Sequence, residues 1–166
     1  MKKILLAAVA GVLAAGCRGD GLLSPSVLTY SATSRVVSNF YGTPAVTSVE
    51  TTVRITNNTD NTITFNYSRG DCGGFELHAF FTADMSGTPI WNSFQAGLEC
   101  GGAGYPPAPL DSGQSVELVI SGPLKDILTA GRPNGTYCFE VVLNVGGGDV
   151  RDSDVHIPAG SVFLAR

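Results

Sequence analysis

The feature that most constrains this chain is the alternation of side chains with a period of two residues over many short segments. In residues 49–56, Val, Thr and Ile hold the odd positions, and Glu, Thr and Arg hold the even positions. In residues 137–145, every odd position is aromatic or aliphatic. Successive side chains of a strand point to opposite faces, so this period predicts strands with one buried face and one solvated face.

Turn signals separate these segments and determine the fold class. Residues 49–56 and 62–67 flank the turn-forming run Asn-Asn-Thr-Asp-Asn at 57–61, which predicts a hairpin. Residues 123–128 begin with proline and predict a helix of one or two turns. The chain has 21 glycines and no alternation of strands with long helices. It is therefore predicted to be all-β, an immunoglobulin-like antiparallel β-sandwich of about seven or eight strands. The other expected strands are 26–37, 75–81, 116–120, 153–157 and 161–165.

The N-terminus has the pattern of an export signal. Lys2 and Lys3 precede an apolar run of 13 residues at 4–16. Such a run is too short to cross a hydrocarbon core about 30 Å thick as a helix, and it is typical of a secretion signal. The run ends in Ala-Ala-Gly-Cys at 14–17, which resembles the bacterial lipobox. The resemblance implies cleavage before Cys17 and lipidation of Cys17.

The chain therefore divides into a lipoprotein signal peptide at 1–16, the lipidated cysteine with its tether at 17–25, and a β-sandwich domain at 26–166. Several acyl chains on one residue anchor a protein durably, so the membrane is an expected partner through the lipid. Arg18, rather than aspartate, follows the cysteine. By resemblance to lipoprotein sorting rules, this residue implies the cell envelope, and the outer membrane in a Gram-negative cell.

Charge and motif content exclude several classes of function. The whole chain has a formal net charge of −4, and removal of the signal leaves 8 basic against 14 acidic residues. Lys125 is then the only lysine, and the arginines do not form the cluster that phosphate binding requires. We therefore expect no nucleic-acid partner. The chain also lacks Cys-x-x-Cys, His-Glu-x-x-His and EF-hand patterns, so no metal and no cofactor are expected.

Three cysteines remain once Cys17 carries lipid. Export into an oxidising compartment makes a disulfide their expected state. Cys72 and Cys100 each precede two glycines, where the backbone adjusts to disulfide geometry, so we expect them to pair. Closure of a loop of that length stabilises a fold by about 3–4 kcal/mol on the chain-entropy model. Cys138 lies within a strand, on the face opposite Tyr137, and is expected to be a free, half-covered thiol.

Three groups of residues carry a resemblance to a known family. They are Ile90-Trp91 with the nearby Phe94-Gln95, the turn Leu-Asp-Ser-Gly-Gln-Ser at 110–115, and Gly-Thr-Tyr at 135–137. Their order resembles the BsuPI-type intracellular proteinase inhibitor family over roughly residues 49–145. The resemblance implies an immunoglobulin-like sandwich and, at most, protease binding. The chain departs from the family in being exported and in carrying cysteines inside the matching region, and no inhibitory residue maps onto it.

Trp91 and Tyr105 are the candidate partner contacts. Tyr105 lies in the segment 97–109, between a glycine-rich half and a proline-rich half. Tyrosine offers a large contact area at low entropic cost, so this segment is the expected binding loop. A simple crossover between strands is the alternative for the loop. Core packing is the alternative for Trp91.

His78 and His156 are the two histidines of the chain, and they are the candidate catalytic bases if the protein is an enzyme. His78 lies two residues after Glu76, on the same polar side of its strand, and is expected to be exposed. An envelope hydrolase would need His78 or His156 beside a nucleophile. We therefore expect a non-catalytic, lipid-anchored envelope protein with an immunoglobulin-like binding or structural domain. A proteinase inhibitor of the BsuPI type and an envelope hydrolase are the alternatives, and an envelope protein or a protease is the expected partner.

Overall fold

The computed structural model describes residues 27–39, 46–65, 75–93, 108–147 and 150–166. The expected signal peptide and tether fall outside these ranges, as do Cys72, Cys100 and Tyr105. Within them the chain forms nine strands and one short helix, so the prediction of an all-β fold is confirmed. The described residues contain no helix that is both long and apolar enough to span a membrane.

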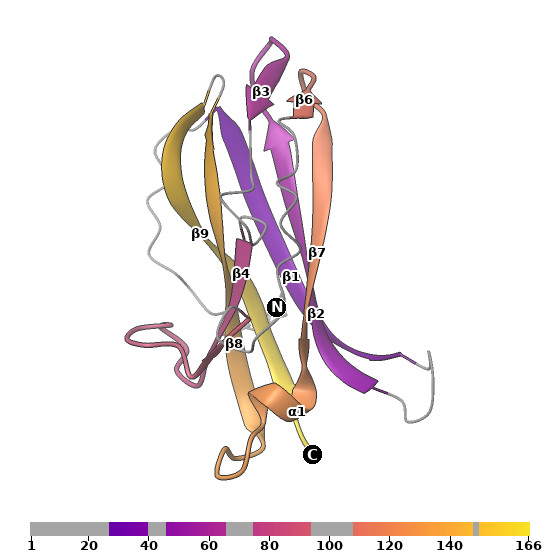
Figure 1. The fold of residues 1–166 in the computed structure, drawn as a ribbon, viewed down its shortest axis with the longest axis vertical. Coiled ribbons are helices and arrows are strands. Elements are labelled where there is room, and N and C mark those ends of the chain that lie inside the picture. Colours follow the sequence, from indigo (N-terminus) through magenta and orange to yellow (C-terminus); the bar gives the residue numbers. More distant parts are fainter. Residues whose placement is uncertain (1–26, 40–45, 66–74, 94–107, 148–149) are drawn as a thin grey trace, which may run out of the picture.

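The strands form two facing layers and a small extra pair (Figure 1). One layer has the order β1-β2-β7, the other has the order β5-β4-β8-β9, and β3 pairs with β6. All of these pairings are antiparallel. The elements are β1 (Leu28–Asn39), β2 (Val46–Asn57), β3 (Ile63–Phe65), β4 (Phe75–Phe80), β5 (Trp91–Asn92), β6 (Ala108–Leu110), β7 (Ser115–Pro123), α1 (Leu124–Ile127), β8 (Gly135–Gly147) and β9 (Val150–Leu164).

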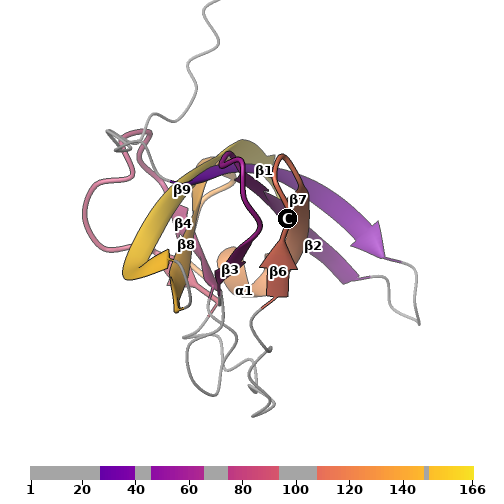
Figure 2. The same ribbon diagram turned by 90° about the horizontal axis from the view of Figure 1, so that it is seen from above.

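The connectivity is immunoglobulin-like. Apart from the short β3 and β6, the chain places its first two strands and β7 in one sheet and β4, β5, β8 and β9 in the other. This distribution matches the two sheets of an immunoglobulin sandwich. The Tyr137 hydroxyl, near the start of β8, donates to the carbonyl of Pro133 at 2.6 Å. Such a hydrogen bond is the tyrosine corner of immunoglobulin-like domains. Seen from above, the strands surround a central core, with β1 beside β9 (Figure 2).

The core lies between the two layers and follows the predicted alternation. The odd positions of β8 between 137 and 145 are all fully buried, and so are Val49, Val53 and Ile55 on β2. Apolar area removed from water contributes roughly 25 cal/mol per Å² to folding. Burial of these side chains on β2 and β8 therefore contributes to the stability of the sandwich.

The predicted hairpin between 49–56 and 62–67 is wrong. β2 pairs with β1 and β7, whereas β3 pairs with β6. The reason lies in Asn57, which is fully buried. Its Nδ2 donates to the carbonyls of Asn61 and Leu110, each at 2.8 Å, and its Oδ1 accepts from the Thr59 amide at 2.9 Å. These bonds direct the turn across to β6 instead of folding the chain back along β2.

Two further predictions are resolved near the C-terminus. The segments 153–157 and 161–165 belong to one long strand, β9, which continues through Gly160 with a φ of +82°. The pairing of β8 with β9 is shifted between Cys138 and Glu140, which accommodates the irregularity. The short helix predicted at 123–128 is confirmed as α1, and its Ile127 is fully buried.

Candidate functional site

Four titratable side chains gather on the outer face of the β5-β4-β8-β9 sheet, and we call them the His–Glu cluster. The odd positions of β8 face the core, so Glu140 faces outward. His78 of β4 stands opposite Glu140 in the strand register, and Glu76 lies two residues from His78 on the same face. His156 of β9 stands opposite Val142, diagonal to Glu140. Three strands therefore contribute to one cluster.

The cluster is closely paired. The His78 Nε2 lies 3.0 Å from the Glu76 Oε2, and the His78 Nδ1 lies 3.8 Å from the Glu140 Oε2. The His156 Nδ1 lies 3.2 Å from the Glu140 Oε1. The side chain of His78 is only 15% exposed and that of Glu140 only 13%. The expectation of a solvent-exposed His78 is therefore wrong, because the two glutamates and the Phe80 ring stand against it.

The pairing shifts the pKa values of the two central groups in opposite directions. Burial lowers the pKa of His78, but the hydrogen bonds and charges of Glu140 and Glu76 raise it above the ordinary value. Burial raises the pKa of Glu140, but His78 and His156 together lower it below the ordinary value. The cluster therefore favours a protonated His78 beside an ionised Glu140.

The chemistry available to the cluster is restricted by its partners. In the described part of the chain, no group of three or more His, Cys, Asp or Glu side chains is arranged to hold a metal ion. Among the described residues, the hydrogen bonds and ion pairs of the His78 and His156 rings are made with carboxylates. The described contacts therefore pair each imidazole of the cluster with a carboxylate.

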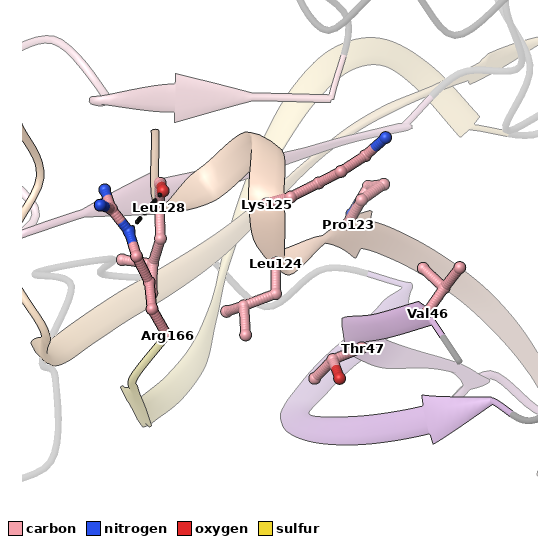
Figure 3. A pocket seen from close by; sticks show the side chains of 7 residues that line it. All are labelled: Val46, Thr47, Pro123, Leu124, Lys125, Leu128 and Arg166. Carbon is pink, nitrogen blue, oxygen red and sulfur yellow. Dashed lines mark hydrogen bonds between the residues drawn. The ribbon is translucent and has the colours of Figure 1, made fainter. Parts of the chain in front are cut away.

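A groove lies at the end of the sandwich where α1 meets the first residues of β2 and the C-terminal residue (Figure 3). Its volume is about 590 Å³. Most of its walls are aliphatic, two of its residues are cations, and none is acidic. The lining residues are Val46, Thr47, Pro123, Leu124, Lys125, Leu128 and Arg166.

Two arginines fix one wall of the groove. The Arg166 Nε donates to the Leu128 carbonyl at 3.1 Å, and its Nη2 donates to the carbonyl of Thr129. The Arg132 Nη1 donates to the Ile127 carbonyl at 2.7 Å. Carbonyls at the end of a helix lack partners within the helix, and cationic side chains satisfy them well. The end of α1 is therefore held from two separate parts of the chain.

The residues predicted to form sites have different outcomes. Trp91 is 6% exposed, and its ring lies so close to Gly122 that an added Cβ would stand 2.6 Å from the Cη2. This is the packing role offered as the alternative to partner contact. Cys17 and Tyr105 lie outside the described residues, as does most of the segment 97–109, so they stay predictions. The end of that segment enters β6.

Cys138 differs from its expected state. It lies on the outer face, as the alternation predicts, but it is 4% exposed and takes part in a disulfide. The expectation of a free, half-covered thiol is therefore wrong. Cys138 is the one cysteine within the ranges that the structure describes. The predicted bond between Cys72 and Cys100 falls on residues outside those ranges.

The sequence reasoning missed the His–Glu cluster and the groove. Alternation alone assigns His78 and Glu140 to outer faces, but their contact depends on the register between β4 and β8. The groove unites residues from the start of β2, the end of β7, α1 and the C-terminus. No local pattern in the sequence marks such a combination.

Comparison with known proteins gives little further information. No protein-family model matches the chain, and no curated protein matches its sequence. Among solved structures, the chain is similar to the crystal structure of the putative ApaA protein from Bordetella pertussis, at 16% sequence identity and a TM-score of 0.43. The similarity covers 83% of this chain and 92% of that one.

Proposed function

We propose that the protein is a lipid-anchored envelope protein that acts by binding, without catalysis, and that its binding end is the groove beside α1. One observation carries this proposal. Leu28, the first residue of β1, pairs with Asn57, whereas Asn39 at the other end of β1 pairs with Val46 of the groove. The chain therefore enters the sandwich at the end opposite the groove.

Strand length makes this separation large. β1 has 12 residues, and a rise of about 3.3 Å per residue gives it a length of roughly 36 Å. The segment from Cys17 to Leu28 covers 11 residue steps, so at 3.6 Å per residue it spans at most about 40 Å when fully extended, close to the length of β1. Because the tether joins the end of the sandwich opposite the groove, the proposal places the entry end nearer the membrane and the groove toward the aqueous phase.

The composition of the groove supports binding over catalysis. Small-molecule sites are mostly apolar with a few placed polar groups, and the groove has this character. The titratable groups of the His–Glu cluster lie on an outer sheet face and satisfy one another. The proposal therefore assigns the cluster to the stability of the sandwich.

The anchor is tested by metabolic labelling with an alkyne-bearing fatty acid, followed by fractionation of the cells. The wild-type protein should carry the label and sediment with membranes, and the Cys17→Ser variant should do neither. Equal labelling of both proteins would exclude the proposed anchor.

The orientation is tested with Lys125, the only lysine beyond residue 3. The lipidated protein is placed on the outside of phosphatidylcholine vesicles and treated with a membrane-impermeant amine reagent, with Lys125→Arg as the control for specificity. Lys125 should react equally fast before and after detergent is added. Protection of Lys125 on intact vesicles would show that the groove faces the membrane.

A further inference from the structure

The charge of the groove is opposite to that of the molecule. The chain has a formal net charge of −4, yet the residues that line the groove include two with cationic side chains and none with an acidic side chain. Elsewhere on the described surface, the Arg35 Nη2 forms an ion pair with the Glu50 Oε1 at 2.5 Å. A concave, low-dielectric surface lined by charge of one sign attracts ligands of the opposite sign.

The two cations of the groove have different roles. Arg166 donates hydrogen bonds from its Nε and Nη2 to backbone carbonyls, so its role is to hold one wall of the groove in place. Lys125 is exposed, and within the described ranges it has no hydrogen bond or ion pair. The two side chains extend to opposite sides of Leu124 (Figure 3). An anionic group at Lys125 would therefore leave the rest of a ligand over the aliphatic part of the groove.

We propose that the groove binds an anionic amphiphile, a long-chain carboxylate taken up as a free monomer, with its carboxylate at Lys125 and its chain against Val46, Leu124 and Leu128. This inference rests on the proposed function, which places the groove away from the membrane and so favours a dissolved ligand over a bilayer lipid. The groove volume of about 590 Å³ falls within the range of about 300–1,000 Å³ that is usual for small-molecule sites.

The experiment compares probes that share a ten-carbon chain and differ in the head group. Decanoate, decanol and decyltrimethylammonium are titrated below their micelle concentrations into the Cys17→Ser protein by calorimetry. Trp91 is the only tryptophan of the chain and packs against Gly122, next to Pro123 of the groove, so its fluorescence gives a second readout. Decanoate should bind at least tenfold more tightly than decyltrimethylammonium.

Variants locate the site. Lys125→Glu should weaken decanoate at least tenfold and leave the melting temperature unchanged. Arg54→Glu, which alters an exposed cation on β2 outside the groove, should leave decanoate binding as it is. Leu124→Ser should weaken all three probes.

Equal affinity for the three probes, absence of decanoate binding, or an unaffected Lys125→Glu variant would each overturn the inference. If one of these results occurs while Cys17 labelling and Lys125 exposure on vesicles hold, the ligand class is wrong and the proposed function stands. If instead the anchor or the orientation fails while decanoate binds through Lys125, the ligand class stands without the envelope role.

Discussion

Among the glycines that the structure describes, Gly122 should be the one where an added methyl group destabilises the sandwich most. A Cβ added there would stand 2.6 Å from the Trp91 Cη2 and 3.1 Å from the Ile127 Cδ1. Optimal separations between carbon atoms are about 3.5–4.0 Å. Trp91 is 6% exposed and Ile127 is fully buried, so neither side chain can turn into solvent.

The sign of the effect separates two physical expectations. Gly122 lies in β7 and does not belong to the glycines with positive φ among the described residues. On backbone grounds alone, alanine in a strand is favoured over glycine by roughly 0.5–1 kcal/mol. Overpacking of a core by an extra group destabilises by about 1–3 kcal/mol. Because the contact is with the buried ring of Trp91 and the buried side chain of Ile127, we expect Gly122→Ala to lower the free energy of unfolding by about 1–3 kcal/mol.

A double-mutant cycle with Trp91→Phe isolates the contact. Phenylalanine lacks the Cη2, so the double variant should be more stable than the sum of the two single changes by about 1 kcal/mol or more. Urea unfolding followed by circular dichroism measures all four proteins, and Ser121→Ala on the exposed neighbouring position is the control, with an expected change within about 0.5 kcal/mol. A neutral or stabilising Gly122→Ala, or strictly additive effects, would refute the tight contact.

Three further predictions follow from the core, the outer face and the disulfide. Phe139→Asp should abolish cooperative unfolding, because Phe139 is fully buried and an unpaired carboxylate there has no partner. In the His–Glu cluster, the pKa of His78 is higher in the folded protein than its unfolded value of 6.5. His78 therefore contributes stability that is fully present below pH 6.5 and that is lost as the pH rises through the folded pKa. The pKa of Glu140 is lower in the folded protein than its unfolded value of 4.5, so Glu140 contributes stability that is present above pH 4.5 and that is lost as the pH falls through the folded pKa. Glu140→Gln should therefore flatten the dependence of stability on pH both below pH 4.5 and above pH 6.5. Peptide mapping without reductant should recover the Cys138 peptide linked by a disulfide to the peptide that contains Cys72 or Cys100. Recovery of Cys138 as a free thiol would contradict this prediction.

The strands could be predicted from the sequence because alternation acts locally. In 137–145 the inner face follows from the odd positions alone, whatever strand lies beside it, and all five are buried. The pairing of strands is a different matter. The turn at 57–61 has the composition of a hairpin, yet Asn57 donates to Leu110, which is 53 residues away. A long-range hydrogen bond of a buried amide therefore favours the pairing of β3 with β6 over a hairpin with β2, and no local sequence pattern indicates this bond.

The same distinction explains the candidate sites. Alternation assigns Glu140 to a solvated face, but its side chain is 13% exposed because His78 and His156 come from two neighbouring strands. Their approach depends on the register of β4 with β8 and on the shift between β8 and β9 near Cys138. Cys138 likewise follows the predicted face, while its burial and its bond arise from parts of the chain that alternation does not describe.

The groove owes its shape to a helix that could not exist alone. α1 has four residues, and Pro123 at its start provides no side-chain hydrogen bond. Isolated helices shorter than about 12 residues are marginal in water, so tertiary contacts must hold this one. Ile127 and Leu128 bury its inner side, and Arg132 and Arg166 bind the carbonyls that follow it. Since these contacts are internal to the sandwich, the aliphatic wall is preformed, and a ligand would order little beyond the Lys125 side chain.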